Sequence, residues 1–295
     1  LGEYDALPGL SQVANIAEPK EVEPGGHGHG CGHNLLGSAA LLAAAGLKDW
    51  LEKTGTPGRV RYYGCPAEEG GAAKGFMVRA GAFDDVDAAV TWHPAGVTRV
   101  GLANSLANTR IDFSFHGRSS HASSAPHLGR SALDAVELMN IGVNYMREHM
   151  PSDARIHYAM LDGGGVAPNV VQGFAKVRHA VRARDLAGMQ ELVERVKKVA
   201  EGAALMTETK MTWKIVSAVS NMLANAPLEK ALYENMQRLG PVPFDAEDRK
   251  YAAEIQATLT EQDIVNEYRK AGVEERENTP LCDFIVPLEV KGVSM

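Results

Sequence analysis

Residues 26–34 read GHGHGCGHN, and an alanine-rich, apolar segment follows them directly. Three histidines and one cysteine fall within seven residues and are separated by single glycines. Glycine lets the backbone bend where a side chain would clash, so several ligands can converge on one point. Imidazole and thiolate together favour a transition metal, most often zinc. The stretch predicts a metal site with Cys31 and His33 as candidate ligands, while His27 and His29 could belong to the loop or support the ligands from behind.

Composition and charge exclude several functional classes. The chain has 295 residues, enough for two domains, and its 45% apolar and 23% charged residues are typical of globular proteins. A net charge of −7 argues against a nucleic-acid partner and against an anionic membrane surface. No apolar run is long enough to span a membrane. The three cysteines form no disulfide framework, which favours a cytoplasmic location.

Strands and helices alternate in the first part of the chain. Apolar residues recur at helical spacing over residues 34–50, and a second helix is expected over residues 72–80. Residues 59–63 and 88–92 have the apolar, β-branched character of strands. This alternation predicts an α/β fold with a mixed, largely parallel sheet.

A different pattern begins near residue 104. Alternating apolar and polar residues predict four strands, and two helices separate them in the order β-α-β-β-α-β. This order is ferredoxin-like, with both helices on one face of the sheet. We therefore predict an inserted domain at residues 104–217 and a first domain made of residues 1–103 and 218–295. Residues 244–271 are predicted as one exposed helix or a pair of helices.

Three groups of reactive side chains accompany the elements of the first domain. Cys31 and His33 precede a helix, Glu68 and Glu69 follow a strand, and His93 ends the next strand. Because ligands gather beyond the carboxyl ends of strands in open α/β sheets, these groups are expected to converge. Adjacent glutamates point in different directions, so one could bind a metal while the other moves a proton of water. The alternatives are a solvated glutamate pair, a structural histidine and a buried, inert cysteine.

The inserted domain carries a further polar segment, Gly117-Arg118-Ser119-Ser120-His121-Ala122. It could be a simple polar loop, or it could deliver His121 to a reaction site from a lid or a partner subunit. Asn169, which follows a run of three glycines, and Arg182, on a predicted strand, could join it. Arg182 could bind a substrate carboxylate through two hydrogen bonds, or it could form a surface salt bridge.

In combination these motifs resemble a known family. Cys31-Gly32-His33-Asn34, Pro66-Ala67-Glu68-Glu69-Gly70 and Ser119-Ser120-His121-Ala122 are similar to motifs of the amidohydrolase branch of the aminoacylase/carboxypeptidase G metallopeptidases. Glu3-Tyr4-Asp5-Ala6-Leu7-Pro8 resembles the first motif of that family. The resemblance covers essentially the whole chain. It implies a zinc-peptidase-like catalytic domain with an inserted lid and dimerisation domain.

The resemblance implies a metal centre with two divalent ions, zinc or manganese. Glu68 would be its general base and acid, and Asp5 would orient a ligand from behind. Glu3 stands where many relatives carry a metal-binding histidine, so its role stays open. The ligands in this chain would be Cys31, His33, Glu69 and His93.

The resemblance also implies a substrate and a partner. His121 would reach across a homodimer interface to polarise the scissile carbonyl, and Asn169 and Arg182 would hold the substrate from the lid. The reaction would be hydrolysis of the amide bond of an N-acyl or N-aroyl amino acid, with p-aminobenzoyl-glutamate as the expected substrate. A related second subunit is an alternative partner.

Two departures from the family pattern leave other interpretations open. Asn34 stands where relatives usually have aspartate. The last ligand of the family is a histidine near the C-terminus, whereas this chain has no histidine after His179, so the chain is expected to be truncated at both ends. One alternative is a non-catalytic paralogue that dimerises and binds metal or ligand weakly. Another is an aminoacylase or dipeptidase of the same family.

Overall fold

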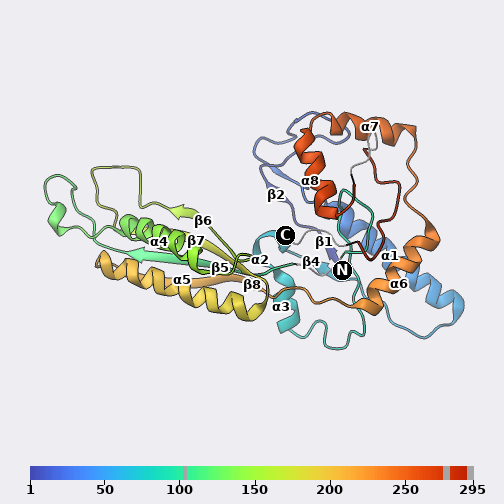
Figure 1. Ribbon diagram of the computed structural model, residues 1–295, viewed down its shortest axis with the longest axis horizontal. Helices are drawn as coiled ribbons and strands as arrows, with labels where there is room; N and C mark the ends of the chain where they lie inside the picture. Colours follow the sequence, from blue (N-terminus) through green and yellow to red (C-terminus); the bar gives the residue numbers. More distant parts are fainter. Residues whose placement is uncertain (102–104, 275–279, 291–295) are drawn as a thin grey trace. The chain divides into compact units, whose positions relative to one another are not determined.

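The computed structural model describes residues 1–101, 105–274 and 280–290. The chain divides into two compact units, coloured by sequence in Figure 1. Unit 1 comprises Leu1–Ala103 together with Leu223–Met295, and unit 2 comprises Asn104–Met222. Unit 1 therefore holds all of the predicted metal ligands, and unit 2 holds His121, Asn169 and Arg182.

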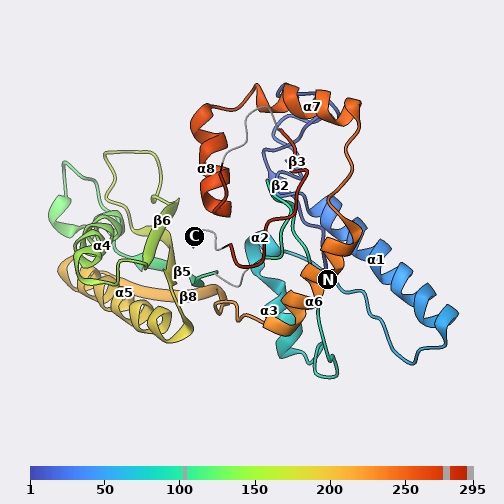
Figure 2. The same cartoon turned by 45° about the vertical axis from the view of Figure 1, so that its right-hand side comes forward.

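Unit 2 is built on a four-stranded antiparallel sheet with the spatial order β6-β7-β5-β8. Both of its long helices cover the same face of the sheet, as the two views in Figures 1 and 2 agree. Along the chain the elements are β5 (Ala107–His116), η1 (Pro126–Leu128), α4 (Ala132–Met146), η2 (Arg147–His149), β6 (Arg155–Asp162), β7 (Phe174–Ala183), α5 (Leu186–Met206) and β8 (Lys210–Val219).

The core of unit 2 lies between the sheet and these helices. Ile111, Phe113 and Phe115 alternate along β5 and are fully buried against apolar residues of α4 and α5. Ser131 and Asp185 cap the two helices, because the side chain of each accepts a hydrogen bond from the backbone N–H three residues further on. Period-two and helical apolar patterns thus meet at one interface, which fixes which side of the sheet is covered.

A histidine is part of this core. His179 on β7 is fully buried, and its Nε2 lies 3.1 Å from Asn140 Oδ1 on α4. The ring contacts the aromatic rings of Phe113 and Tyr158, with centroid distances of 5.8 and 5.3 Å. Burial, together with the positive charge of Arg147, lowers the pKa of His179 from 6.5 to about 4. The imidazole is therefore neutral in the folded chain at neutral pH.

We expect unit 2 to lose stability as the pH falls from about 6.5 to about 4. The unfolded chain protonates His179 near 6.5 but the folded chain only near 4, so the unfolded state binds more protons throughout this window. The shift corresponds to about 3 kcal/mol of unfolding free energy. Urea unfolding at pH 7 and pH 4.5 measures the loss, which His179→Leu should largely remove; an equal loss in that variant would contradict the explanation.

Unit 1 contains two short strand pairs and six helices in its described residues. Strand β1 (Gly2–Glu3) runs parallel to β4 (Gly64–Cys65), and β2 (Leu7–Pro8) pairs antiparallel with β3 (His27–Gly28). The helices are α1 (His33–Thr54), α2 (Glu68–Gly71), α3 (Ala73–Arg79), α6 (Ala226–Leu239), α7 (Ala246–Gln256) and α8 (Glu261–Ala271).

Helix predictions for unit 1 agree with the structure, but the strand predictions do not. Helices α1 and α3 lie where helices were predicted, and residues 244–271 form the helix pair α7 and α8. Residues 59–63 and 88–92 form no strand. They are linked to the N-terminal segment only by single hydrogen bonds, such as Gly2 N–H to Tyr63 O at 2.9 Å.

The prediction of a largely parallel sheet is therefore wrong for the described residues. Their parallel pairing is limited to β1 with β4 and an isolated bridge between Thr98 and Ile285. Parallel sheets need cover on both faces, yet the side chains of Val90 and Trp92 are 54% and 41% exposed. None of the helices in the described ranges has both the length and the apolar character needed to cross a bilayer.

Candidate metal centre

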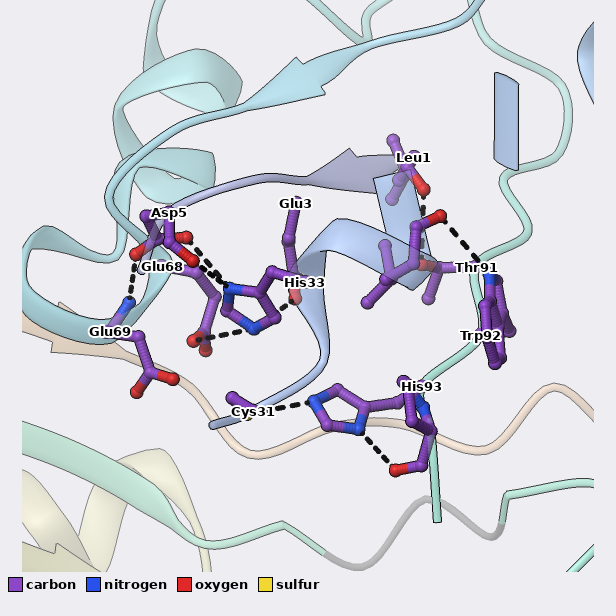
Figure 3. Close-up of polar contacts among 12 residues, drawn as sticks. Leu1, Glu3, Asp5, Cys31, His33, Glu68, Glu69, Thr91, Trp92 and His93 are labelled. Carbon is purple, nitrogen blue, oxygen red and sulfur yellow. Dashed lines mark hydrogen bonds and ion pairs between the residues drawn. The ribbon is translucent and has the colours of Figure 1, made fainter. Parts of the chain in front are cut away.

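The predicted ligands of unit 1 meet at one end of the β1–β4 pair. Glu3 and Asp5 lie at and just beyond the end of β1, and Glu68 and Glu69 open α2 just after β4. Because the two strands are parallel, their carboxyl ends lie at the same edge. Figure 3 shows these side chains pointing toward His33, the first residue of α1.

Two glycines bring α1 close to this edge. Gly32 precedes the helix with φ of 75°, and a Cβ there would lie 2.8 Å from a Pro94 side-chain carbon. A Cβ at Gly37 would lie 2.7 Å from the carbonyl oxygen of Glu3. Only glycine satisfies both the left-handed backbone and the close approach at Gly32. The glycine after Cys31 therefore positions His33, as the spacing of the motif suggested.

The protonation of His33 follows from its neighbours. Its Nδ1 lies 3.0 Å from Asp5 Oδ1 and 3.1 Å from the Asp5 carbonyl oxygen, and both atoms are acceptors. Nδ1 therefore carries the proton, and Nε2 presents a lone pair. This Nε2 is completely buried and makes no hydrogen bond of acceptable geometry. It faces Glu3 Oε2 at 3.3 Å and Glu68 Oε2 at 4.0 Å.

His93 is arranged in the same way from another segment. Its Nδ1 lies 2.8 Å from the Pro94 carbonyl oxygen, so this nitrogen carries the proton. The Nε2 lone pair then faces Cys31 Sγ at 3.3 Å, as Figure 3 shows. The rings of His33 and His93 are 5.9 Å apart at 84°. Two imidazole nitrogens and a sulfur therefore point into one small volume.

The centre carries an excess of negative charge. Burial raises the pKa of the Cys31 thiol to about 11, and Glu69, Glu68 and Glu3 add to the increase. Burial also raises the pKa of Glu68, with further contributions from the charges of Glu3 and Glu69. Lys74 pairs with Glu3 Oε1 and offsets one charge. A bound divalent cation would reverse these shifts, because it favours thiolate and carboxylate.

The donor atoms fit a divalent transition metal. Cys31, His33 and His93 offer ligand atoms that all lie within 4.8 Å of one another, and so do Glu3, His33 and Glu68. Glu69 contacts Cys31 through its side chain, and its backbone N–H donates to Asp5 Oδ2 at 2.9 Å. Mixed sulfur, nitrogen and oxygen donors around a buried Nε2 without a hydrogen bond suit zinc, and suit manganese less strongly.

The structure also places the residues that the sequence left open. His27 and His29 are exposed and belong to neither group of candidate ligands in the described residues. Sequence reasoning missed Lys74 and left Glu3 undecided. Position in the first motif was the only signal for Glu3, and no spacing rule marks Lys74, because its ion pair depends on how α3 packs beside β1.

Within unit 2 the structure brings His121 and Asn169 together. The Asn169 carbonyl accepts the Ala122 N–H at 2.9 Å, and His121 forms a bridge with Val170. Arg182 is not part of this group. It pairs with Asn108 and Arg155 near the end of β7, eight residues after the strand begins at Phe174, which is about 26 Å of extended chain.

Comparison with known proteins decides the family. Residues 1–274 match the model of peptidase family M20/M25/M40. The chain belongs to this family. It is 50% identical over 278 residues to one of the two subunits of p-aminobenzoyl-glutamate hydrolase from Escherichia coli K12, covering 94% of this chain and 58% of that protein. It is 32% identical over 252 residues to human Xaa-Arg dipeptidase, covering 84% and 53%.

Membership of the M20/M25/M40 family confirms the resemblance drawn from the motifs. The chain spans a little over half the length of these two relatives. A Bacillus subtilis dinuclear metal binding peptidase from the M20 family shares the fold, with a TM-score of 0.54 and 20% identity over 81% of this chain and 62% of that one. At that identity the likeness supports the α/β peptidase fold alone.

Proposed function

We propose that this chain carries the metal centre of an amidohydrolase that cleaves N-acyl or N-aroyl amino acids, with p-aminobenzoyl-glutamate as substrate. The observation that carries the proposal is the pair of imidazole nitrogens, on His33 and His93, whose lone pairs face a cysteine and carboxylates. Such a pocket is stable only with a cation inside it. The 50% identity to an enzyme named for this substrate supports the specific choice.

In this proposal Cys31, His33, Glu69 and His93 hold one or two divalent ions, zinc or manganese. A bound divalent ion lowers the pKa of water and polarises a carbonyl group. Asp5 keeps the Nδ1 proton on His33, so that Nε2 stays free to bind. Asp5 therefore orients a ligand rather than binding the ion, because its second oxygen accepts the Glu69 N–H.

Glu68 is the proposed general base and acid. Its carboxylate faces the centre, with Oε2 at 4.0 Å from His33 Nε2, and its side chain is partly exposed. Burial and the nearby Glu3 and Glu69 raise its pKa, which favours a group that must both accept and release a proton. Glu68 would take the proton of the attacking water and return it to the leaving amine.

His121 is the proposed donor to the carbonyl oxygen of the substrate. Its Nδ1 lies 3.3 Å from both the Ser123 and Ser124 backbone nitrogens, which can only donate. The neutral ring therefore carries its proton on Nε2, ready to donate to a developing oxyanion. We assign this role to the homodimer partner of each centre, with the ferredoxin-like unit serving as lid and dimerisation domain.

Asn169 and Arg182 are proposed to hold the substrate. Since a strand length separates them, an acyl-amino acid bound to one chain could touch only one of them from that chain. This separation supports a dimer in which the two residues act on different substrate molecules. A related second subunit is the alternative partner, because the Escherichia coli relative is named as one of two different subunits. Three free thiols support a cytoplasmic location.

A dipeptidase or aminoacylase is the second candidate, supported by the 32% identity to human Xaa-Arg dipeptidase. The two candidates separate in an assay of the full-length gene product with zinc or manganese. p-Aminobenzoyl-glutamate, N-acetyl amino acids and dipeptides ending in arginine form the substrate panel. Fastest hydrolysis of the aroyl-glutamate supports the first proposal. Metal bound without turnover of any substrate would favour a non-catalytic paralogue.

A further inference from the structure

The carboxylates around His33 are not equivalent. Both oxygens of Asp5 are engaged, one by the Nδ1 of His33 and the other by the backbone of Glu69. The side chain of Glu69 contacts Cys31. Glu3 is different, because Lys74 engages only its Oε1 and leaves Oε2 directed at His33, as Figure 3 shows. Glu3 is buried, with 9% of its surface exposed.

The contact between Glu3 and His33 requires a cation. Since Nδ1 of His33 holds its proton against Asp5, Nε2 and Glu3 Oε2 face each other with lone pairs at 3.3 Å. Two acceptors buried at this distance repel one another unless a proton or a metal ion lies between them. The Nε2 makes no hydrogen bond, so the geometry is not that of a shared proton.

The distance itself matches a shared metal ion. Two ligand atoms about 2.1 Å from one tetrahedral ion lie about 3.4 Å from each other. The 3.3 Å between His33 Nε2 and Glu3 Oε2 fits this edge, whereas the 4.0 Å to Glu68 Oε2 exceeds it. Glu3 is thus better placed than Glu68 to share an ion with His33.

We propose that Glu3 is itself a metal ligand, that its Oε2 binds the ion held by His33 Nε2, and that Lys74 fixes the carboxylate for this contact. The proposal rests on the metal-binding function proposed above. It adds an oxygen donor from β1 to the ligands that the family motifs supply. Lys74 also offsets part of the negative charge that a third carboxylate brings to the centre.

A pair of isosteric variants tests this inference. Glu3→Gln and Glu68→Gln each remove one negative charge from the centre, but only the first removes a proposed ligand. The full chain is stripped of metal, and Zn²⁺ and Mn²⁺ affinities are measured by chelator competition. We expect Glu3→Gln to weaken Zn²⁺ binding at least a hundredfold and Glu68→Gln to weaken it less than tenfold. Cobalt-substituted protein should change its visible absorption spectrum in Glu3→Gln alone.

The outcomes separate this inference from the proposed function. If the unaltered chain binds metal and the two variants weaken binding equally, Glu3 is no ligand, although the metal centre stands. If the unaltered chain binds no metal, both proposals fall. Far-UV circular dichroism checks the fold of each variant. Should Glu3→Gln not fold, Glu3→His decides, because an imidazole there should retain the ion, and a folded variant that loses it overturns the inference.

Discussion

Replacing Glu68 with glutamine is expected to lower kcat by about a thousandfold, within the range that general acid–base groups contribute. The amide keeps the size of the side chain but cannot take a proton from water. The metal content should stay unchanged, because the proposed ligands Cys31, His33, Glu69 and His93 are intact. Hydrolysis of p-aminobenzoyl-glutamate under saturating substrate measures kcat, and elemental analysis of the dialysed protein measures metal.

Glu52→Gln is the matched control for this experiment. Glu52 is an exposed residue of α1 that pairs with Lys48 on the surface, so its loss should leave kcat unchanged. A Glu68→Gln protein that keeps its metal and more than about a tenth of the activity would remove Glu68 from the role of general base. Loss of metal in that variant would instead make Glu68 a ligand, and would shift the base to another group.

The raised pKa of Glu68 carries a further expectation for the same assay. A base must be ionised to act, so activity should fall on the acid side as Glu68 takes up a proton. Burial together with Glu3 and Glu69 moves this acid limb to a higher pH than an ordinary glutamate would give. Because Glu3→Gln removes one of the charges responsible, it should move the limb back toward lower pH.

The sequence predicted the helices of unit 1 better than its strands, for a physical reason. Helix α1 shows its own period within one segment, so residues 34–50 sufficed to locate it. A strand is stabilised by partners that the sequence does not display. Residues 88–92 are apolar enough for a buried strand, yet in the structure Val90 is largely exposed and contributes only a single hydrogen bond to Leu1.

The candidate site shows the same division between local and tertiary information. Adjacent motif residues such as Glu68 and Glu69 could be identified because their chemistry is read directly from the chain. The pairing of Lys74 with Glu3 joins residues 71 positions apart and could not. Likewise, no pattern revealed that Arg182 and Asn169 lie at opposite ends of a strand, because that depends on the register of β6, β7 and β5.

Mixing two inactive variants is expected to restore activity if His121 acts across a dimer. His121→Ala should lower kcat by about a hundredfold or more, since it removes a donor to the oxyanion. Glu68→Gln is inactive for a separate reason. In a mixed dimer, the centre with an intact Glu68 would receive an intact His121 from its partner. Random exchange should therefore give roughly a quarter of the unaltered activity, because half of the dimers are mixed and each holds one complete site.

The alternatives give different results in the same mixture. If His121 serves the centre of its own chain, each chain lacks one essential group and mixing restores nothing. If His121 has no role, the His121→Ala protein is active before mixing. Denaturation and joint refolding ensure exchange, and sedimentation confirms that dimers form. Because His121 holds its proton on Nε2 through the Ser123 and Ser124 amides, His121→Ala with both serines retained isolates the imidazole as the group that crosses between subunits.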